Sequence, residues 1–188
     1  MKEIRWHGRG GDGAFTAAKL LGLAASVFGG KYGQAFPSFG PERRGAPVLG
    51  FTRISDEVIT DHSQIYTCDC VIVLDDTLCD VTDVFAGMKA GGTLVINTTK
   101  SEEEIRSLYH GNDPVNVVLL DATSIALEEL KAPIVNTIML GAAMGATEMV
   151  QKTQLEEAID SMMAPALREK NKKAMARAYD LVKGGAQG

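Results

Sequence analysis

The residues best suited to bind a ligand form a glycine-rich turn near the N-terminus. Gly8, Gly10 and Gly13 have the spacing G-x-G-x-x-G, with Gly11 as an additional glycine and Asp12 inside the turn. Glycines at these positions allow positive φ and let the backbone come close to a ligand or to another chain. One interpretation is a dinucleotide site, in which N–H groups at the start of the next helix bind a pyrophosphate. The other is a tight turn that lets the first strand and the first helix pack closely.

Two features of the sequence argue against the dinucleotide site. Such a site requires an acidic residue about 20 positions after the glycines, whereas residues 34–38 read QAFPS and contain no carboxylate. Asp12 is expected to cap the helix, and its charge would repel a phosphate at close range. The P-loop pattern is absent as well, because no Gly-Lys-Ser/Thr follows the turn.

A second candidate is the stretch PSFGPERRGAP, residues 37–47. Its prolines and glycines exclude a regular helix and an interior strand, so we expect a stiff loop that loses little entropy when a partner binds. The loop presents Glu42, Arg43 and Arg44 in a row. Because arginine makes bidentate contacts to carboxylates and phosphates, the pair predicts a docking surface for an anion or an ion-paired partner. The alternative is an internal ion pair that holds the loop shut.

The cysteines and histidines do not complete a catalytic or metal-binding pattern. Cys68 and Cys70 have no second Cys or His pair with which to form a zinc or iron–sulfur site, and Cys79 leaves an odd number of thiols. Two cysteines this close along one strand are not expected to bridge, so we predict reduced thiols and a cytoplasmic location. The histidines are isolated from one another: His7, His62 and His110.

Asp75 and Asp76 follow the apolar run CVIVL, where open α/β sheets place ligands. The same residues are ordinary caps for a following helix, and we favour capping. The sequence also contains no recognisable pair of a nucleophile and a base. It therefore predicts a chain that completes an active site formed with other subunits.

Composition and charge restrict the class of protein. The chain has 188 residues, 45% of them hydrophobic, which suits one domain with a large core. No apolar run is long enough to span a membrane, and a net charge of −5 argues against a nucleic-acid binder. Residues 168–183 are locally basic, which indicates a solvated helix face or a subunit contact.

The order of apolar runs and breakers predicts an α/β fold: a single three-layer domain over residues 1–188, with a mostly parallel twisted sheet and helices on both faces. Strands are expected at 2–6, 32–36, 48–54, 70–74, 93–97 and 115–120, with an extension at 58–59. Helices are expected at 14–28, 79–88, 101–109, 122–130, 137–147, 154–163 and 166–183, followed by a disordered tail. Ser101 with Glu104, and Thr153 with Glu156, are predicted capping boxes. Gly141 and Gly145 share a helical face and should admit another backbone.

Two segments taken together carry a resemblance to a known family. GRGGDGAFTAAKLL at 8–21 and QAFPSFGPERRGAPVLGFTRIS at 34–55 closely resemble the gamma subunit of 2-oxoacid:ferredoxin oxidoreductases, particularly the pyruvate (pyruvate synthase) type. The likeness covers essentially the whole chain. The family's usual GGQG is here Gly10, Gly11, Asp12 and Gly13, so any role of the glutamine amide is altered.

The resemblance implies a complex in which alpha and beta subunits hold thiamine diphosphate with Mg²⁺ and a delta subunit holds [4Fe–4S] clusters. The implied reaction is oxidative decarboxylation of a 2-oxoacid with coenzyme A, giving acyl-CoA, CO₂ and reduced ferredoxin. This chain would carry no cofactor or metal itself, be inactive alone, make contacts between copies when isolated, and bind neither nucleic acid nor membrane.

Seven residues are implied to lie near the thiamine pocket or the coenzyme A path, at the alpha/beta interface: Gly8, Gly10, Gly11, Asp12, Gly13, Arg43 and Arg44. Two alternatives stay open at this point. One is a stand-alone nucleotide-binding α/β module without catalysis. The other is the gamma subunit of a branched-chain 2-oxoacid or oxalate oxidoreductase.

Overall fold

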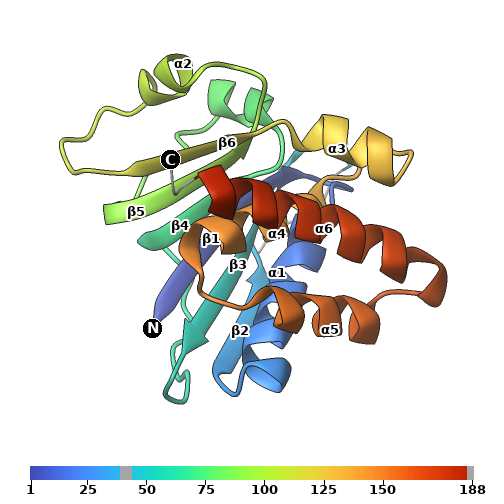
Figure 1. Cartoon of the computed structure of the whole chain (residues 1–188). Helices are drawn as coiled ribbons and strands as arrows, with labels where there is room; N and C mark the ends of the chain where they lie inside the picture. Colours follow the sequence, from blue (N-terminus) through green and yellow to red (C-terminus); the bar gives the residue numbers. More distant parts are fainter. Residues whose placement is uncertain (39–43, 186–188) are drawn as a thin grey trace.

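A computed structural model describes residues 1–38 and 44–185 of the chain. One sheet of six strands, in the order β2-β3-β1-β4-β5-β6, forms its centre (Figure 1). The strands are β1 (Lys2–Arg9), β2 (Tyr32–Pro37), β3 (Pro47–Ser55), β4 (Cys68–Val73), β5 (Met88–Asn97) and β6 (Asn116–Leu120). The helices are α1 (Ala14–Leu23), α2 (Glu102–Arg106), α3 (Ala122–Glu129), α4 (Asn136–Thr147), α5 (Lys152–Met162) and α6 (Pro165–Gly185), with a π-helix η1 (Ala24–Phe28) and a 3₁₀ helix η2 (Asp76–Asp80).

The sheet is mixed. Strands β1, β4, β5 and β6 pair in parallel, whereas β3 is antiparallel to both β1 and β2. β2 and β3 pair antiparallel because residues 38–46 between them are too few for the crossover of about a dozen or more residues that a parallel return needs. The predicted α/β fold is confirmed, and the parallel part of its sheet consists of β1, β4, β5 and β6.

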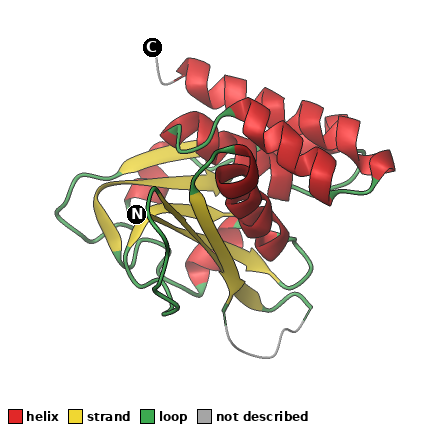
Figure 2. Cartoon of the chain, turned by 90° about the horizontal axis from the view of Figure 1, so that it is seen from below, coloured by secondary structure: helices red, strands yellow, loops and turns green. Residues whose placement is uncertain are grey.

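The two faces of the sheet are covered unequally. Helices α1, α3, α4, α5 and α6 build the larger core on one face, where Ile4 and Trp6 of β1 are fully buried. The other face carries a smaller core with Phe51 and Phe85, covered by α2 and by loops. Figure 2 shows most of the helices gathered on one side of the strands. Because side chains alternate along a strand, Arg5 and His7 of β1 point to the thinly covered face.

The close approach predicted for Gly141 and Gly145 is confirmed. A Cβ built on Gly141 would lie 2.2 Å from the carbonyl oxygen of Met175, and one on Gly145 would lie 2.5 Å from that of Tyr179. Both carbonyls belong to α6, so α4 and α6 pack backbone against backbone. Residues 136–145 of α4 are all buried by this packing and by the sheet.

Several local expectations are wrong. No helix spans 79–88: the 3₁₀ helix η2 ends at Asp80, and Gly87 has φ 74°, which a helix cannot contain. Residues 58–59 do not extend the sheet, and Val58 is exposed. The second capping box is formed by Gln151 and Gln154, because α5 already begins at Lys152. Helix α6 continues to Gly185, so the first two residues of the predicted tail are helical, and the rest lies outside the described residues.

Candidate functional site

The glycines of the N-terminal turn serve two different purposes. A Cβ on Gly8 would lie 2.9 Å from the Cβ of Ala14, and a Cβ on Gly13 would lie 2.5 Å from Nδ2 of Asn136. These two glycines let β1, α1 and α4 pack closely, as the tight-turn interpretation predicts. Gly11 has φ 101°, and a Cβ added there would meet no atom within 4 Å, so this glycine faces open space.

Asp12 does not cap α1. The N-cap of this helix is Gly13, which makes no side-chain bond, whereas the Asp12 carboxylate accepts a hydrogen bond of 2.9 Å from the backbone N–H of Arg9. The Asp12 N–H in turn donates to the Arg9 carbonyl at 2.9 Å. The expectation of a helix cap is therefore wrong, because the carboxylate folds back across the turn. Its negative charge still lies close to the start of α1, where it opposes phosphate binding.

The glycine turn and the end of the proline-rich loop lie side by side. The N–H of Gly10 donates to the carbonyl of Ala46 at 2.8 Å, and the N–H of Gly45 donates to the carbonyl of Gly10 at 2.9 Å. Gly10 and Arg44 form an isolated parallel bridge, and Arg44 is exposed. The structure thus brings the two predicted segments together, while Glu42 and Arg43 lie outside the described residues.

Arg9 links this junction to the end of β4. Its Nε donates to Oδ2 of Asp75 at 2.7 Å, its Nη2 to the hydroxyl of Thr77 at 2.7 Å, and its Nη1 to the carbonyl of Gly45 at 3.1 Å. Asp75 caps η2 by accepting from the Thr77 N–H; a cap was predicted here, but for a helix over 79–88 that does not form. Partial burial acts to raise the pKa of Asp75, but hydrogen bonds from Thr77 and Arg9 outweigh it, and the pKa is lowered. Sequence reasoning did not identify Arg9, although its position directly before the turn is a usable signal.

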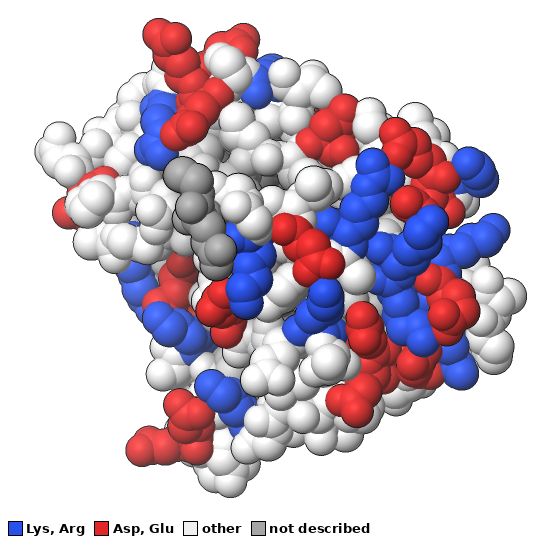
Figure 3. All heavy atoms as spheres, viewed as in Figure 1, with Lys and Arg blue, Asp and Glu red and all other residues white. Residues whose placement is uncertain are grey.

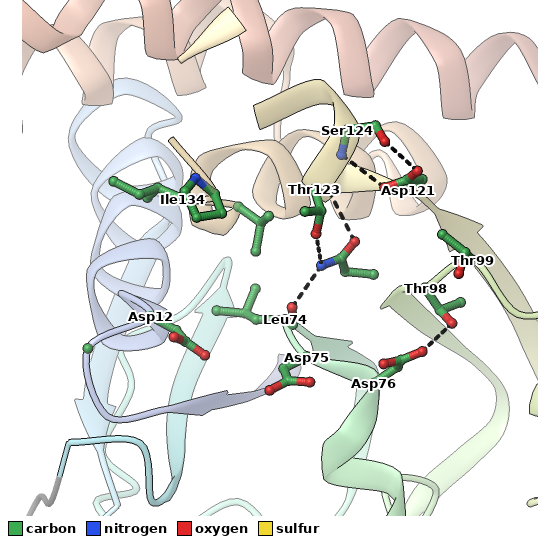
Figure 4. A pocket seen from close by; sticks show the side chains of 14 residues that line it. Asp12, Leu74, Asp75, Asp76, Thr98, Thr99, Asp121, Thr123, Ser124 and Ile134 are labelled. Carbon is green, nitrogen blue, oxygen red and sulfur yellow. Dashed lines mark hydrogen bonds between the residues drawn. The ribbon is translucent and has the colours of Figure 1, made fainter. Parts of the chain in front are cut away.

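A pocket of about 540 Å³ lies beside the turn, at the carboxyl ends of the parallel strands (Figure 4). It is lined by Gly11, Asp12, Leu74, Asp75, Asp76, Asn97, Thr98, Thr99, Asp121, Thr123, Ser124, Pro133, Ile134 and Val135. Asn97 supports the wall by donating to the Leu74 carbonyl and to the Thr123 hydroxyl, each at 3.0 Å. Ligands of parallel α/β sheets occupy this end of the strands.

The lining of this pocket is rich in carboxylates that are already hydrogen-bonded. Asp76 accepts from the Thr98 hydroxyl at 2.5 Å, and Asp121 accepts from the Ser124 N–H and hydroxyl, which lower the pKa of Asp121. Such a wall suits hydroxyl, amide or ammonium donors of a ligand and repels phosphate. In residues 1–38 and 44–185 no group of three or more His, Cys, Asp or Glu side chains is arranged to hold a metal ion. The hydroxyls of Thr98 and Ser124 are bonded to carboxylates, and no histidine or cysteine is among the residues that line the pocket.

The other reactive side chains lie elsewhere. Cys68 and Cys70 are buried free thiols, and burial raises the pKa of Cys68 and Cys79, which makes them poor nucleophiles. His62 bonds the side chain of Gln34 at 3.0 Å, and His110 borders a different cavity. None of the three histidines lines the pocket of Figure 4.

The basic face of α6 is largely matched by acids of neighbouring helices. Lys172 pairs with Asp160 at 3.0 Å, Arg177 with Glu128 at 2.6 Å, and Lys183 with Glu148 at 2.9 Å. Figure 3 shows these blue and red side chains interleaved over the helical side of the molecule. These ion pairs agree with the solvated-face interpretation of this helix. Among the described helices, none is both long and apolar enough to cross a bilayer.

Comparison with known proteins finds one family and close relatives over nearly the full length. Residues 3–181 match the family model described as pyruvate ferredoxin/flavodoxin oxidoreductase. The chain is 52% identical to the pyruvate/ketoisovalerate oxidoreductases common subunit gamma of Thermococcus kodakarensis, over 96% of each chain. It is 48% identical to the pyruvate synthase subunit PorC of Methanothermobacter marburgensis, over 97% of this chain and 98% of the relative. The crystal structure of the pyruvate oxidoreductase subunit PORC of Thermotoga maritima superimposes with a TM-score of 0.81 at 40% identity, covering 95% of each chain.

Proposed function

The chain belongs to the pyruvate ferredoxin/flavodoxin oxidoreductase family, and from this premise we propose that it is the gamma subunit of a multisubunit pyruvate synthase type enzyme. The proposed reaction of the whole enzyme is oxidative decarboxylation of a 2-oxoacid with coenzyme A to acyl-CoA and CO₂, with two electrons passed to ferredoxin. The observation that carries this proposal is the sequence identity of 52% and 48%, over nearly the full length, to two relatives that are themselves named as subunits.

The proposed partners are alpha, beta and delta subunits, and ferredoxin reached through the complex. The cysteines of this chain do not suit an iron–sulfur cluster. Cys68 and Cys70 are buried within one strand and cannot supply the four thiolates of a cluster. We propose that the partner subunits hold the clusters and the thiamine diphosphate with its Mg²⁺, and that the complex lies in the cytoplasm, consistent with the free thiols.

For this chain we propose an interface role beside the coenzyme A path. The proposed contact residues are Gly8, Gly10, Gly11, Asp12, Gly13, Arg43 and Arg44. Gly8 and Gly13 act through packing, whereas Gly11 borders the pocket and Arg44 is exposed next to the turn. This arrangement supports a division of labour: an arginine recognises phosphate or carboxylate, and the carboxylate-lined pocket accepts hydroxyl or amide donors.

The choice of 2-oxoacid is proposed to lie outside this subunit. The Thermococcus relative is named as the gamma subunit common to a pyruvate and a ketoisovalerate oxidoreductase. A subunit shared by two enzymes with different substrates cannot itself select between them. We propose pyruvate as the substrate of the complex, with a branched-chain 2-oxoacid as the alternative.

The test is co-expression of the four subunits with the double variant Arg43→Ala, Arg44→Ala in the gamma chain. If these arginines contact a partner, less complex will elute on size exclusion. If they contact coenzyme A, assembly will be unchanged and the KM for coenzyme A will rise about tenfold or more, because charge-assisted hydrogen bonds are lost. Arg106→Ala, on the short helix α2, is the matched control. Normal assembly together with normal coenzyme A dependence would remove the proposed role of the loop.

The alternative function, a stand-alone nucleotide-binding module, is tested with the isolated chain. Calorimetric titration with ADP and with coenzyme A should show weak binding or none, because the Asp12 carboxylate lies at the start of α1 and the pocket wall is acidic. Micromolar binding of ADP would instead favour the module.

A further inference from the structure

The polar face of β1 carries a buried charge, that of Arg5, which forms no ion pair with another described residue. Along this strand Glu3, Arg5, His7 and Arg9 point to the thinly covered side of the sheet. Glu3 accepts from Arg53 at 3.2 Å and from Lys89 at 3.4 Å. Arg9 pairs with Asp75 at 2.7 Å, at the end of the strand. The only acid on this face of β1 is therefore already shared by two other cations.

Arg5 is buried, with an exposed fraction of 7%, yet no carboxylate of the described residues lies within 4.0 Å of it. Its Nε donates to Nε2 of His7 at 2.9 Å, and its Nη2 donates to the carbonyls of Val84 at 3.1 Å and Ala86 at 2.7 Å. A buried guanidinium held only by neutral acceptors bears an uncompensated desolvation cost. Its Nη1 has no bonding partner among the described residues.

His7 adds a second donor at the same place. Because Nε2 accepts from Arg5, the neutral ring carries its proton on Nδ1. Burial and the neighbouring charge of Arg5 lower the pKa of His7 to about 3, so the ring is neutral at physiological pH. Every fully buried side-chain nitrogen and oxygen of the described residues has a hydrogen-bond partner. Nδ1 of His7 and Nη1 of Arg5 have no partner among the described residues, so both atoms keep some exposed surface, and both residues line a cavity.

That cavity has a volume of about 250 Å³ and lies between β1, the segment before β4 and the loop after η2. Besides Arg5 and His7, its wall includes Gln64, Thr82 and Asp83. The Asp83 carboxylate accepts from the N–H of Phe85 at 2.9 Å and makes no ion pair with Arg5. The cavity shares no lining residue with the pocket beside the glycine turn.

We propose that this cavity is a carboxylate site, in which Nη1 of Arg5 donates to one carboxylate group and His7 forms part of the neighbouring wall. Arginine recognises planar oxyanions, and the anion would supply the charge that the buried guanidinium lacks. The volume is below the roughly 300–1,000 Å³ typical of pockets for drug-sized ligands, so the carboxylate belongs to a small organic acid or to a single acidic side chain of a partner subunit. The partner-subunit source rests on the proposed function, whereas binding of a small organic acid does not.

The test uses the purified full-length chain, labelled with ¹⁵N and titrated with sodium acetate at constant ionic strength. Acetate should shift the ring signals of His7 and the Nε signal of Arg5 in a saturable manner, and chloride should not. Arg5→Gln should weaken binding at least tenfold, whereas Arg106→Gln, which removes an exposed arginine of α2, should leave it unchanged.

Two further measurements keep the result decisive. If Arg5→Gln does not fold, Gln64→Glu leaves Arg5 in place, and its added negative charge should weaken acetate binding about tenfold. If the carboxylate comes from a partner, acetate binds weakly and Gln64→Glu lowers the yield of co-purified subunits instead. A folded variant that changes neither acetate binding nor subunit assembly would overturn the proposal.

Discussion

Replacement of Gly141 by alanine is expected to destabilise the protein even though alanine is the better helix former. On an open helix the change from glycine to alanine adds up to about 1 kcal/mol of stability. Here the new methyl group would lie 2.2 Å from the carbonyl oxygen of Met175, far inside van der Waals contact. Because that oxygen belongs to the backbone of α6, it cannot rotate away, and the two helices must separate.

Forced overpacking of a core costs about 1–3 kcal/mol, and a clash this close with a backbone atom belongs to the upper part of that range, about 2–3 kcal/mol. After the gain of about 1 kcal/mol in helix propensity, the net loss is about 1–2 kcal/mol. For a chain of this length that corresponds to a decrease in Tm of about 2–8 °C. Gly145→Ala, with its methyl group 2.5 Å from the carbonyl oxygen of Tyr179, should behave similarly. The double variant should cost less than the sum, because one displacement of α6 relieves both clashes.

The assay is urea unfolding followed by circular dichroism, with Gly22→Ala as the matched control. Gly22 is also a buried helical glycine, but a Cβ there would lie 3.5 Å from the nearest atom, the Cβ of Ala35, which is ordinary contact. Gly22→Ala should therefore be neutral or stabilising by up to about 1 kcal/mol. If Gly141→Ala proves as stable as the wild type, α4 and α6 do not pack as described, and the reasoning fails.

Three other outcomes follow from single contacts. Because the pKa of His7 is lowered to about 3, only the unfolded state binds a proton at this residue between pH 6.5 and 3. The free energy of unfolding should therefore fall by about 2 kcal/mol from pH 6.5 to pH 5. His7→Gln should abolish this pH dependence in urea titrations. Arg9→Met removes three hydrogen bonds and should cost about 1–3 kcal/mol and speed amide exchange at Gly45, with unchanged exchange counting against the anchoring role. Ser101→Ala opens the capping box with Glu104 and should cost about 1 kcal/mol in thermal unfolding, whereas an unaltered Tm would show that α2 does not depend on its cap.

Local patterns were predictable where neighbours in sequence supply both partners of a contact. The capping box of Ser101 forms as expected, and Asp75 caps a helix as expected, although that helix is η2 and not the predicted 79–88. Each of these contacts joins residues no more than three positions apart. The Thr153 box failed because α5 already begins at Lys152, and the sequence pattern alone does not distinguish the two starting points. Asp12 failed for a related reason, since its carboxylate had two donors within reach and bonded the N–H of Arg9.

The sequence by itself determined the α/β class, the family resemblance and the close packing that Gly141 makes possible, because periodicity, breakers and motif wording are properties of short segments. Only the tertiary structure decided which segments meet. The Arg9–Asp75 pair, the junction of Gly10 with the arginine loop, and the cavity at Arg5 each join parts of the chain that lie far apart in sequence. Such contacts depend on strand order and on which face a side chain occupies, and these are set by burial of the whole core rather than by any single stretch of residues.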